Sequence, residues 1–338
     1  MNEKEARKKA VTTAQAYKDV KQGSSKHKKI VDTFNKVKPD GWAMTYTAAW
    51  CATFASADAI LAFGTTYAKK YFPLSANCPN IIAKAKKMGI FVERDSYIPK
   101  LGDWVLYDWQ DNGKGDNTGS PDHVGIVEKV GLSTFTVIEG NFSTQKKVGE
   151  RTIAFNGRYI RGFVTPNYAA IAKAKTDDEA KKLGKAMTDL ARKQLGHGYK
   201  KYCKAFGKNT SWCQIFMWWL ADKKNLKYLK DSYARHGAKW AKKNWTHVSM
   251  KDARAGDFVY FTSGGKGNNK MNGKVTHVGL IRATAKPETK GKDKGKVIKV
   301  YTIEGNVNGG GDWKKSEVAK KTRKKSYVWG IFRPPYKK

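Results

Sequence analysis

The sequence has few cysteines, few histidines and no long apolar run. No stretch of about eighteen apolar residues occurs among its 338 residues, which argues against a transmembrane helix. Residues 1–10 are charged and lead into no apolar segment, so a standard secretory signal is not expected. Four cysteines are too few for a disulfide scaffold, and none has paired metal-ligand spacing. Hydrophobic residues make up 40% and aromatic residues 12%, which is typical of a globular protein.

Acidic residues are also scarce, since 29 Asp and Glu face 66 Lys and Arg, a formal net charge of +37. The excess is uneven: residues 1–168 hold 25 basic and 16 acidic residues, whereas residues 169–338 hold 41 and 13. Such a field concentrates polyanions at the surface and makes their binding sensitive to salt. Nucleic acids, anionic membranes and the teichoic acids of bacterial walls all qualify, so charge alone selects no partner.

The chain repeats one set of landmarks in the same order. Each half contains an aromatic-Cys pair before an apolar run, a His-Val-Gly segment and an Ile-Glu-Gly-Asn segment. The landmark residues are Cys51, His123, Glu139 and Asn141 in the first half, and Cys213, His277, Glu304 and Asn306 in the second. We therefore expect two copies of one domain, at 1–168 and 181–338. An alanine- and charge-rich linker is expected at about 169–180.

Both halves show helical patterns first and strand patterns later. Amphipathic helices are expected near residues 10–17 and 183–191, and a further helix begins at or near each landmark cysteine. Strands are expected at 103–109, 123–130 and 134–141, and again at 257–263, 276–283 and 297–306. This order predicts an α+β fold in which each half packs an antiparallel sheet on a cysteine-bearing helix.

The landmark residues also have the chemistry of a nucleophilic site. A thiol has an ordinary pKa of about 8.5, and the unpaired N–H groups at a helix N-terminus favour its ionised form. A histidine can take the thiol proton and return it to a leaving amine, while a carboxylate fixes the tautomer of the imidazole. Glu139 and Asn141 are two residues apart on an expected strand and should share a face, as should Glu304 and Asn306.

Each landmark has an ordinary structural explanation when taken alone. A cysteine before an apolar helix is usually part of the core, and Glu-Gly-Asn is a turn signal. The recurrence of all the landmarks in one order favours catalysis over packing. Cys78 and Cys203 have no histidine in a repeated context, so we expect them to be structural or free thiols.

Both halves resemble CHAP domains, the papain-like, NlpC/P60-related cysteine amidohydrolases of bacterial and phage cell-wall lysis. The matching motifs are Trp50-Cys51-Ala-Thr-Phe, Asp122-His123-Val-Gly and Ile138-Glu139-Gly-Asn141 in the first half, and Trp212-Cys213, Thr276-His277-Val-Gly and Ile303-Glu304-Gly-Asn306 in the second. The resemblance covers nearly the whole chain. It implies that the two cysteines are nucleophiles, the two histidines general bases, the two glutamates their orienting groups, and Asn141 and Asn306 a fourth polar member.

The resemblance further implies a peptidoglycan hydrolase. The scissile bond is either the amide between muramic acid and the stem peptide or a peptide bond of the stem or cross-bridge. No cofactor or metal is expected, because the segments before Cys51 and Cys213 lack the carboxylates with which some family members bind calcium. The expected partners are peptidoglycan and anionic wall polymers, with no specific nucleic acid. Without a signal peptide, we expect release of the phage-lysin type or carriage in a virion.

Other interpretations remain open. Gln214 stands where the first half has Ala52, and residues 285–296 add a Lys- and Gly-rich loop, so the first half is the closer match. In one alternative, only one half is catalytic and the basic second half is a non-catalytic module that binds the wall. A basic nucleic-acid-binding protein and a cysteine protease that cleaves proteins are further alternatives.

Overall fold

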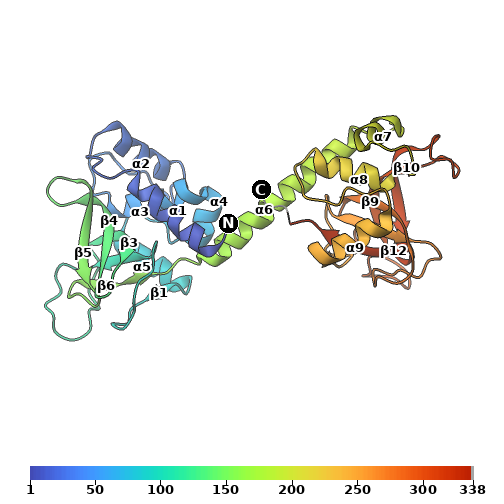
Figure 1. The fold of residues 1–338 in the computed structure, drawn as a ribbon. Coiled ribbons are helices and arrows are strands. Elements are labelled where there is room, and N and C mark those ends of the chain that lie inside the picture. The colour runs from blue at the N-terminus through green and yellow to red at the C-terminus, as the bar shows by residue number, and fades with distance from the viewer. Residues whose placement is uncertain (336–338) are drawn as a thin grey trace. The chain divides into compact units, whose positions relative to one another are not determined.

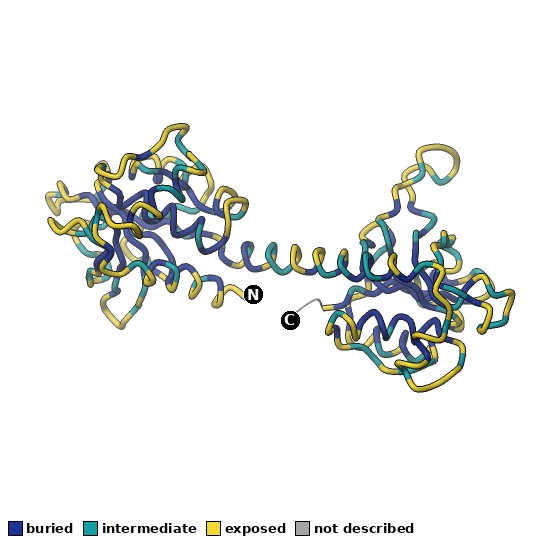
Figure 2. Tube along the Cα trace, turned by 90° about the horizontal axis from the view of Figure 1, so that it is seen from above, coloured by how far each residue is buried: buried dark blue, intermediate teal, exposed yellow. Residues whose placement is uncertain are grey.

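The computed structural model describes residues 1–335, so residues 336–338, the end of the second expected domain, lie outside the description. The chain divides into two compact units (Figure 1). Unit 1 is Met1–Lys175, and unit 2 begins at Thr176. Buried residues form a separate interior in each unit, whereas the loops at the periphery are exposed (Figure 2). Among the described residues, no helix is long and apolar enough to cross a membrane.

Unit 1 combines five helices with a six-stranded antiparallel sheet. The helices are α1 (Glu3–Gln15), α2 (Ser25–Asn35), α3 (Cys51–Phe63), α4 (Thr65–Tyr71) and α5 (Cys78–Lys87). The strands are β1 (Phe91–Val92), β2 (Trp104–Tyr107), β3 (His123–Val130), β4 (Thr134–Phe142), β5 (Lys147–Ala154) and β6 (Ile160–Val164). Their order in the sheet is β1-β6-β2-β3-β4-β5. Helix α3 packs against β3 and β4.

Unit 2 has the same strand order. Its helices are α7 (Lys200–Phe206), α8 (Cys213–Asp222) and α9 (Ala234–Asn244), with a short 3-10 turn η1 (Lys325–Tyr327). Its strands are β7 (Thr246–Val248), β8 (Phe258–Thr262), β9 (Val275–Ala283), β10 (Lys299–Val307), β11 (Glu317–Lys324) and β12 (Val328–Arg333). The antiparallel sheet reads β7-β12-β8-β9-β10-β11, which matches unit 1 strand for strand. Helix α8 packs on β9 and β10, as α3 does on β3 and β4.

The segment expected as a linker, 169–180, is helical. It forms part of α6 (Tyr168–Arg192), which begins among the core residues of unit 1 and ends among those of unit 2. Alanine and lysine make up seven of its twelve residues, and these residues have high helix propensity. The composition that marks a domain joint therefore also favours a helix.

The cysteine-bearing helices are buried nearly all round. Twelve of the thirteen residues of α3 and eight of the ten of α8 are buried, as expected for a helix hydrophobic on every side. The glycine of each Glu-Gly-Asn motif lets the neighbouring strand approach this helix. A Cβ on Gly140 would lie 2.4 Å from Phe54 Cβ, and one on Gly305 would lie 2.8 Å from Phe216 Cβ. These glycines therefore serve close packing between strand and helix.

Candidate active site

In unit 1 the folding brings Cys51, His123 and Glu139 together. Cys51 is the first residue of α3, His123 is the first residue of β3, and Glu139 lies on the adjacent strand β4. His123 Nε2 is 3.0 Å from Glu139 Oε2, so Nδ1 is the ring nitrogen left for the thiol. Glu139 is fully buried, whereas Cys51 and His123 retain 6% and 9% exposure.

The glycine of the His-Val-Gly motif makes room for the glutamate. A Cβ on Gly125 would lie 2.7 Å from Glu139 Cγ, and one on Gly279 would lie 2.6 Å from Glu304 Cγ. The glutamate side chain can therefore lie across the neighbouring strand, toward the histidine two residues earlier on that strand. In both units, the glycines of the His-Val-Gly and Glu-Gly-Asn motifs therefore stand where a larger residue would clash with a neighbouring side chain.

The electrostatics of this site favour a charged pair of thiolate and imidazolium. A hydrogen bond from the Cys78 thiol and the interaction with His123 lower the pKa of Cys51 well below its usual range, although burial opposes them. Burial disfavours the charged form of His123, but Cys51 and Glu139 outweigh it and raise the pKa of His123 to about 9. The site therefore favours the thiolate form of Cys51 and the protonated form of His123.

An arginine that the sequence did not single out completes the environment of the glutamate. Arg151, on β5, places its Nε 3.1 Å from Glu139 Oε1 and 3.3 Å from Oε2. Burial raises the pKa of Glu139, but His123 and Arg151 overcome this effect and lower it. The Arg151 guanidinium also lies over the Trp109 ring, 5.0 Å from its centre. Glu139 therefore stays ionised although it has no exposed surface.

Asn141 lies at the site, but not by the regular alternation we expected. The register between β4 and β5 shifts between Glu139 and Phe142, and Asn141 has φ 56°, in the left-handed region. Its side chain, with Trp109, His123, Ser143 and Arg151, lines a cavity of about 350 Å³. Asn141 Oδ1 is buried and accepts no hydrogen bond from the described part of the chain. It therefore faces the same cavity as the histidine and has a free acceptor.

Cys78, which we expected to be a structural or free thiol, belongs to this site. It is the first residue of α5, and its Sγ is 4.0 Å from Cys51 Sγ. The hydrogen bond to Cys51, together with burial and the Cys51 charge, raises the pKa of Cys78 well above its usual range. The contact therefore favours the neutral form of Cys78 and the thiolate form of Cys51. Cys203, in contrast, is buried on α7 and lies 3.8 Å from the Thr210 carbonyl oxygen.

Unit 2 repeats the arrangement. Cys213 is the first residue of α8, and His277 Nε2, on β9, is 2.9 Å from Glu304 Oε2 on β10. Arg323, on β11, has its Nε 3.0 Å from Glu304 Oε1. Burial disfavours imidazolium, but Cys213 and Glu304 raise the pKa of His277 to about 10. Burial opposes ionisation of Glu304, but His277 and Arg323 lower its pKa to about 2.

The fourth polar residue is held differently in unit 2. Asn306 has φ 63°, and again the register of its strand shifts beside it. Its Nδ2 donates to Ser211 Oγ at 2.7 Å, and its Oδ1 accepts from Ser316 Oγ at 2.8 Å. The expected shared face with Glu304 is therefore again lost to a bulge, and both polar ends of Asn306 are occupied.

A hydroxyl group lies near the glutamate in each unit, but it belongs to a residue at a different position in the two units. In unit 2, Thr302 Oγ1 donates to Glu304 Oε1 at 2.6 Å, and unit 1 has Val137 at this position. In unit 1, the Tyr107 hydroxyl is buried without a satisfied hydrogen bond, and burial and the Glu139 charge raise the pKa of Tyr107. Unit 2 has Phe261 where unit 1 has Tyr107. The two sites therefore differ at two linked positions.

The surroundings of the two thiols also differ. Helix α9 begins with Ala234, where the corresponding helix α5 begins with Cys78. Gln214 is buried next to Cys213, and its Oε1 accepts from the Tyr228 hydroxyl at 3.0 Å. A Cβ on Gly237 would lie 2.4 Å from Gln214 Oε1, so this glycine on α9 leaves room for the larger side chain. Unit 2 thus places an amide and a phenol where unit 1 has a second thiol.

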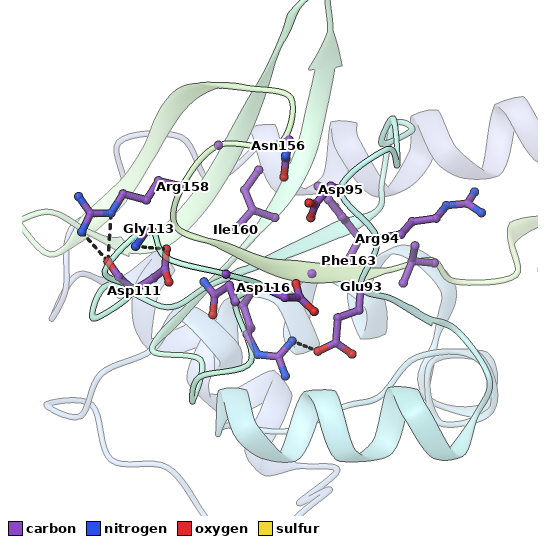
Figure 3. A pocket seen from close by; sticks show the side chains of 16 residues that line it. Glu93, Arg94, Asp95, Asp111, Gly113, Asp116, Asn156, Arg158, Ile160 and Phe163 are labelled. Atoms are coloured by element: carbon purple, nitrogen blue, oxygen red, sulfur yellow. Dashed lines mark hydrogen bonds and ion pairs between the residues drawn. The ribbon is translucent and has the colours of Figure 1, made fainter.

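A second cavity in unit 1, of about 380 Å³, lies apart from these residues. Glu93, Asp95, Asp111 and Arg158 are among its lining residues (Figure 3). Its lining includes none of the four landmark residues of unit 1. Arg158 Nη2 donates to the Asp111 carbonyl oxygen at 2.7 Å, and Arg161 pairs with Glu93. The guanidinium groups of Arg158 and Arg161 are therefore already engaged by other groups of the protein.

Comparison with known proteins identifies a CHAP domain at residues 41–141. This segment includes Cys51, His123, Glu139 and Asn141. The match supports a relation of unit 1 to a family of peptidoglycan hydrolases. No curated protein matches the sequence. The structure of an NlpC/P60 family protein from Bacillus cereus ATCC 10987 is similar, with 13% identity and a TM-score of 0.28. The alignment covers 74% of this chain and 65% of that one.

Proposed function

We propose that the protein is a peptidoglycan hydrolase that cleaves amide bonds at two cysteine sites. The observation that carries this proposal is the recurrence of one Cys-His-Glu-Arg arrangement around a buried glutamate, on two sheets of identical strand order. In unit 1 the arrangement falls on the CHAP domain, apart from its arginine. Unit 2 is then a second CHAP-like domain.

The proposed reaction begins with the Cys51 thiolate, which attacks the carbonyl carbon of the scissile amide. The N–H groups at the start of α3 face the developing oxyanion, and the Ala52 N–H already bonds to the Cys51 sulfur. The His123 imidazolium protonates the leaving amine, and an acyl-enzyme results. Neutral His123 then takes a proton from water, whose oxygen attacks the acyl group and frees the cysteine. Cys213 and His277 play the same roles in unit 2.

The substrate would lie over the cavity at His123 and Asn141. Trp109 borders this cavity, is 36% exposed, and stacks on Tyr107 with ring centres 4.7 Å apart. An exposed ring held flat by a buried one offers a rigid surface for a sugar or peptide group. We propose either an N-acetylmuramoyl-L-alanine amidase or a stem or cross-bridge endopeptidase.

A second candidate is that only unit 1 is catalytic and unit 2 binds the wall. The amide and phenol beside Cys213 and the occupied Asn306 favour this candidate, whereas the complete Cys-His-Glu-Arg set opposes it. In either case we propose that the basic second half holds anionic wall polymers. Action at the cell wall after release of the phage-lysin type is part of the proposal.

The test uses purified Gram-positive cell walls and four full-length proteins: wild type, Cys51→Ala, Cys213→Ala and the double variant. Turbidity measures lysis, and mass spectrometry of the fragments identifies the new chain ends. We expect the double variant to be inactive and each single variant to keep one site's products. If Cys213→Ala is active and Cys51→Ala is inactive, unit 2 is a binding module and only unit 1 is catalytic. Full lysis by the double variant would overturn the cysteine mechanism, and cleavage of casein would favour the protease alternative.

A further inference from the structure

The site of unit 1 contains two thiols, of which the proposed reaction uses only one. Cys51 Sγ and Cys78 Sγ are 4.0 Å apart, and both residues are free cysteines. Each is the first residue of its helix, α3 or α5, so both sulfurs lie at helix N-termini. Cys51 is 6% exposed and Cys78 is 5% exposed. A small oxidant that reaches Cys51 therefore finds a second sulfur beside the first.

The chemical states of the two thiols suit stepwise oxidation. Oxidants of the peroxide class react with thiolates, and Cys51 is the thiol whose pKa is lowered. The pKa of Cys78 is raised chiefly through its hydrogen bond to Cys51, then by burial and the Cys51 charge. Conversion of Cys51 to a neutral sulfenic acid removes that charge. Cys78 then ionises more readily, next to the sulfur that it would attack.

We propose that Cys51 and Cys78 form an oxidation site that closes to a reversible disulfide on reaction with a peroxide and so inactivates unit 1. This inference goes beyond the proposed function and depends on it only for the loss of lysis. Unit 2 has Ala234 at the start of the corresponding helix and cannot form such a bond. Oxidation would therefore leave the site of unit 2 reduced or drive it to other products.

The atoms and electrons balance with one peroxide per disulfide. The Cys51 thiolate attacks a peroxide oxygen, the S–O bond forms, the O–O bond breaks, and the leaving hydroxide takes a proton from the His123 imidazolium to become water. The Cys78 sulfur then attacks the sulfenic sulfur of Cys51. The S–S bond forms, the S–O bond breaks, and the departing hydroxide takes the Cys78 proton as a second water. The two sulfurs together lose two electrons, and the peroxide gains them.

The experiment exposes full-length Cys213→Ala protein to a small molar excess of hydrogen peroxide. Remaining thiols are then blocked, and the protein is digested without reductant for mass spectrometry. We expect a cross-linked peptide pair containing Cys51 and Cys78, two hydrogens lighter than the separate peptides. We also expect lysis to be lost and then recovered to at least half with dithiothreitol. The matched control, Cys78→Ala in the same background, is compared with its own untreated lysis rate and should lose lysis irreversibly because Cys51 proceeds to sulfinic acid.

Two results would overturn the proposal. One is oxidised Cys51 with Cys78 still reduced in folded protein, and the other is equal recovery of lysis by both variants. Cys78→Ser is a second control should the alanine variant unfold, with circular dichroism to report folding. The cross-link is read by mass alone, so a protein that forms it but never lyses walls would contradict the proposed function and leave this inference intact.

Discussion

At the residue scale, the histidines set the pH range of each site. Both histidine pKa values are raised above the ordinary 6.5, to about 9 for His123 and about 10 for His277. A raised pKa keeps the imidazolium present to higher pH, and it is lost as pH rises through that value. The acid needed to protonate the leaving amine is therefore lost at higher pH in unit 2 than in unit 1.

This difference predicts two separable alkaline limbs. In Cys213→Ala, kcat/KM should fall about tenfold per pH unit above about pH 9, and in Cys51→Ala above about pH 10. The measurement is initial lysis rate against pH at constant ionic strength, with each variant serving as the other's control. A fall near pH 6.5 in both would mean that the thiol and carboxylate do not hold the imidazolium.

The residues of the candidate sites differ in how far the sequence could reveal them. Cys51, His123 and Glu139 stand in motifs that recur in the second half of the chain, so the repetition identified them as candidate site residues. Cys78 stands in no repeated motif, since its counterpart is Ala234, and its contact with Cys51 joins residues that α4 separates along the chain. Only the folded chain places these thiols together.

Arg151 and Arg323 were missed for another reason. They recur in the two units but lie in segments of mixed polar residues, β5 and β11, whose outer positions are exposed. Segments with so few apolar residues give only a weak hydrophobic pattern for a strand, and we expected no strand there. Because β5 and β11 were not predicted, the contacts of their arginines with Glu139 and Glu304 could not be predicted either.

At the element scale, three strands of each sheet were predicted close to their observed bounds. These are β2, β3 and β4 in unit 1 and β8, β9 and β10 in unit 2, which lie centrally and are rich in β-branched and aromatic residues. The other strands of each sheet were not predicted. Strand β1 has only two residues, and β5 is half exposed, so neither has a strong hydrophobic period.

The close approach of strand and helix gives an element-scale prediction. Gly305→Ala would place a Cβ 2.6 Å from Trp212 Cζ3 and should push β10 away from α8, at a cost of about 1–3 kcal/mol in unfolding free energy. Because β10 also carries Glu304, activity of the unit 2 site should fall in the Cys51→Ala background. Thermal unfolding and lysis rate measure the two effects.

Gly198→Ala is the matched control for this change. Its Cβ would make an ordinary contact, 3.7 Å from the Ser316 carbonyl oxygen, and Gly198 does not have a positive φ. We expect little change in either measurement. If Gly305→Ala behaved like this control, the strand and helix would tolerate separation and the steric explanation of the motif would be wrong.

At the scale of the whole molecule, charge gives the main prediction. The net charge of +37 should hold even an inactive protein on anionic walls. We expect the full-length Cys51→Ala, Cys213→Ala double variant to sediment with walls at low salt and to be released at about 1 M salt, where the screening length is about 3 Å. Walls stripped of their anionic polymers are the control and should retain less protein. Retention that is independent of salt would assign binding to specific contacts instead.

The exchanged hydroxyls at the two glutamates constrain how the two copies can change. Unit 1 combines Tyr107 with Val137 and unit 2 combines Phe261 with Thr302, so each unit has one hydroxyl near its buried carboxylate. A single exchange between the copies would give a site with two hydroxyls or with none, whereas a paired exchange would preserve the count. We therefore expect the two positions to be epistatic, so that a paired exchange between the units is tolerated better than either single exchange.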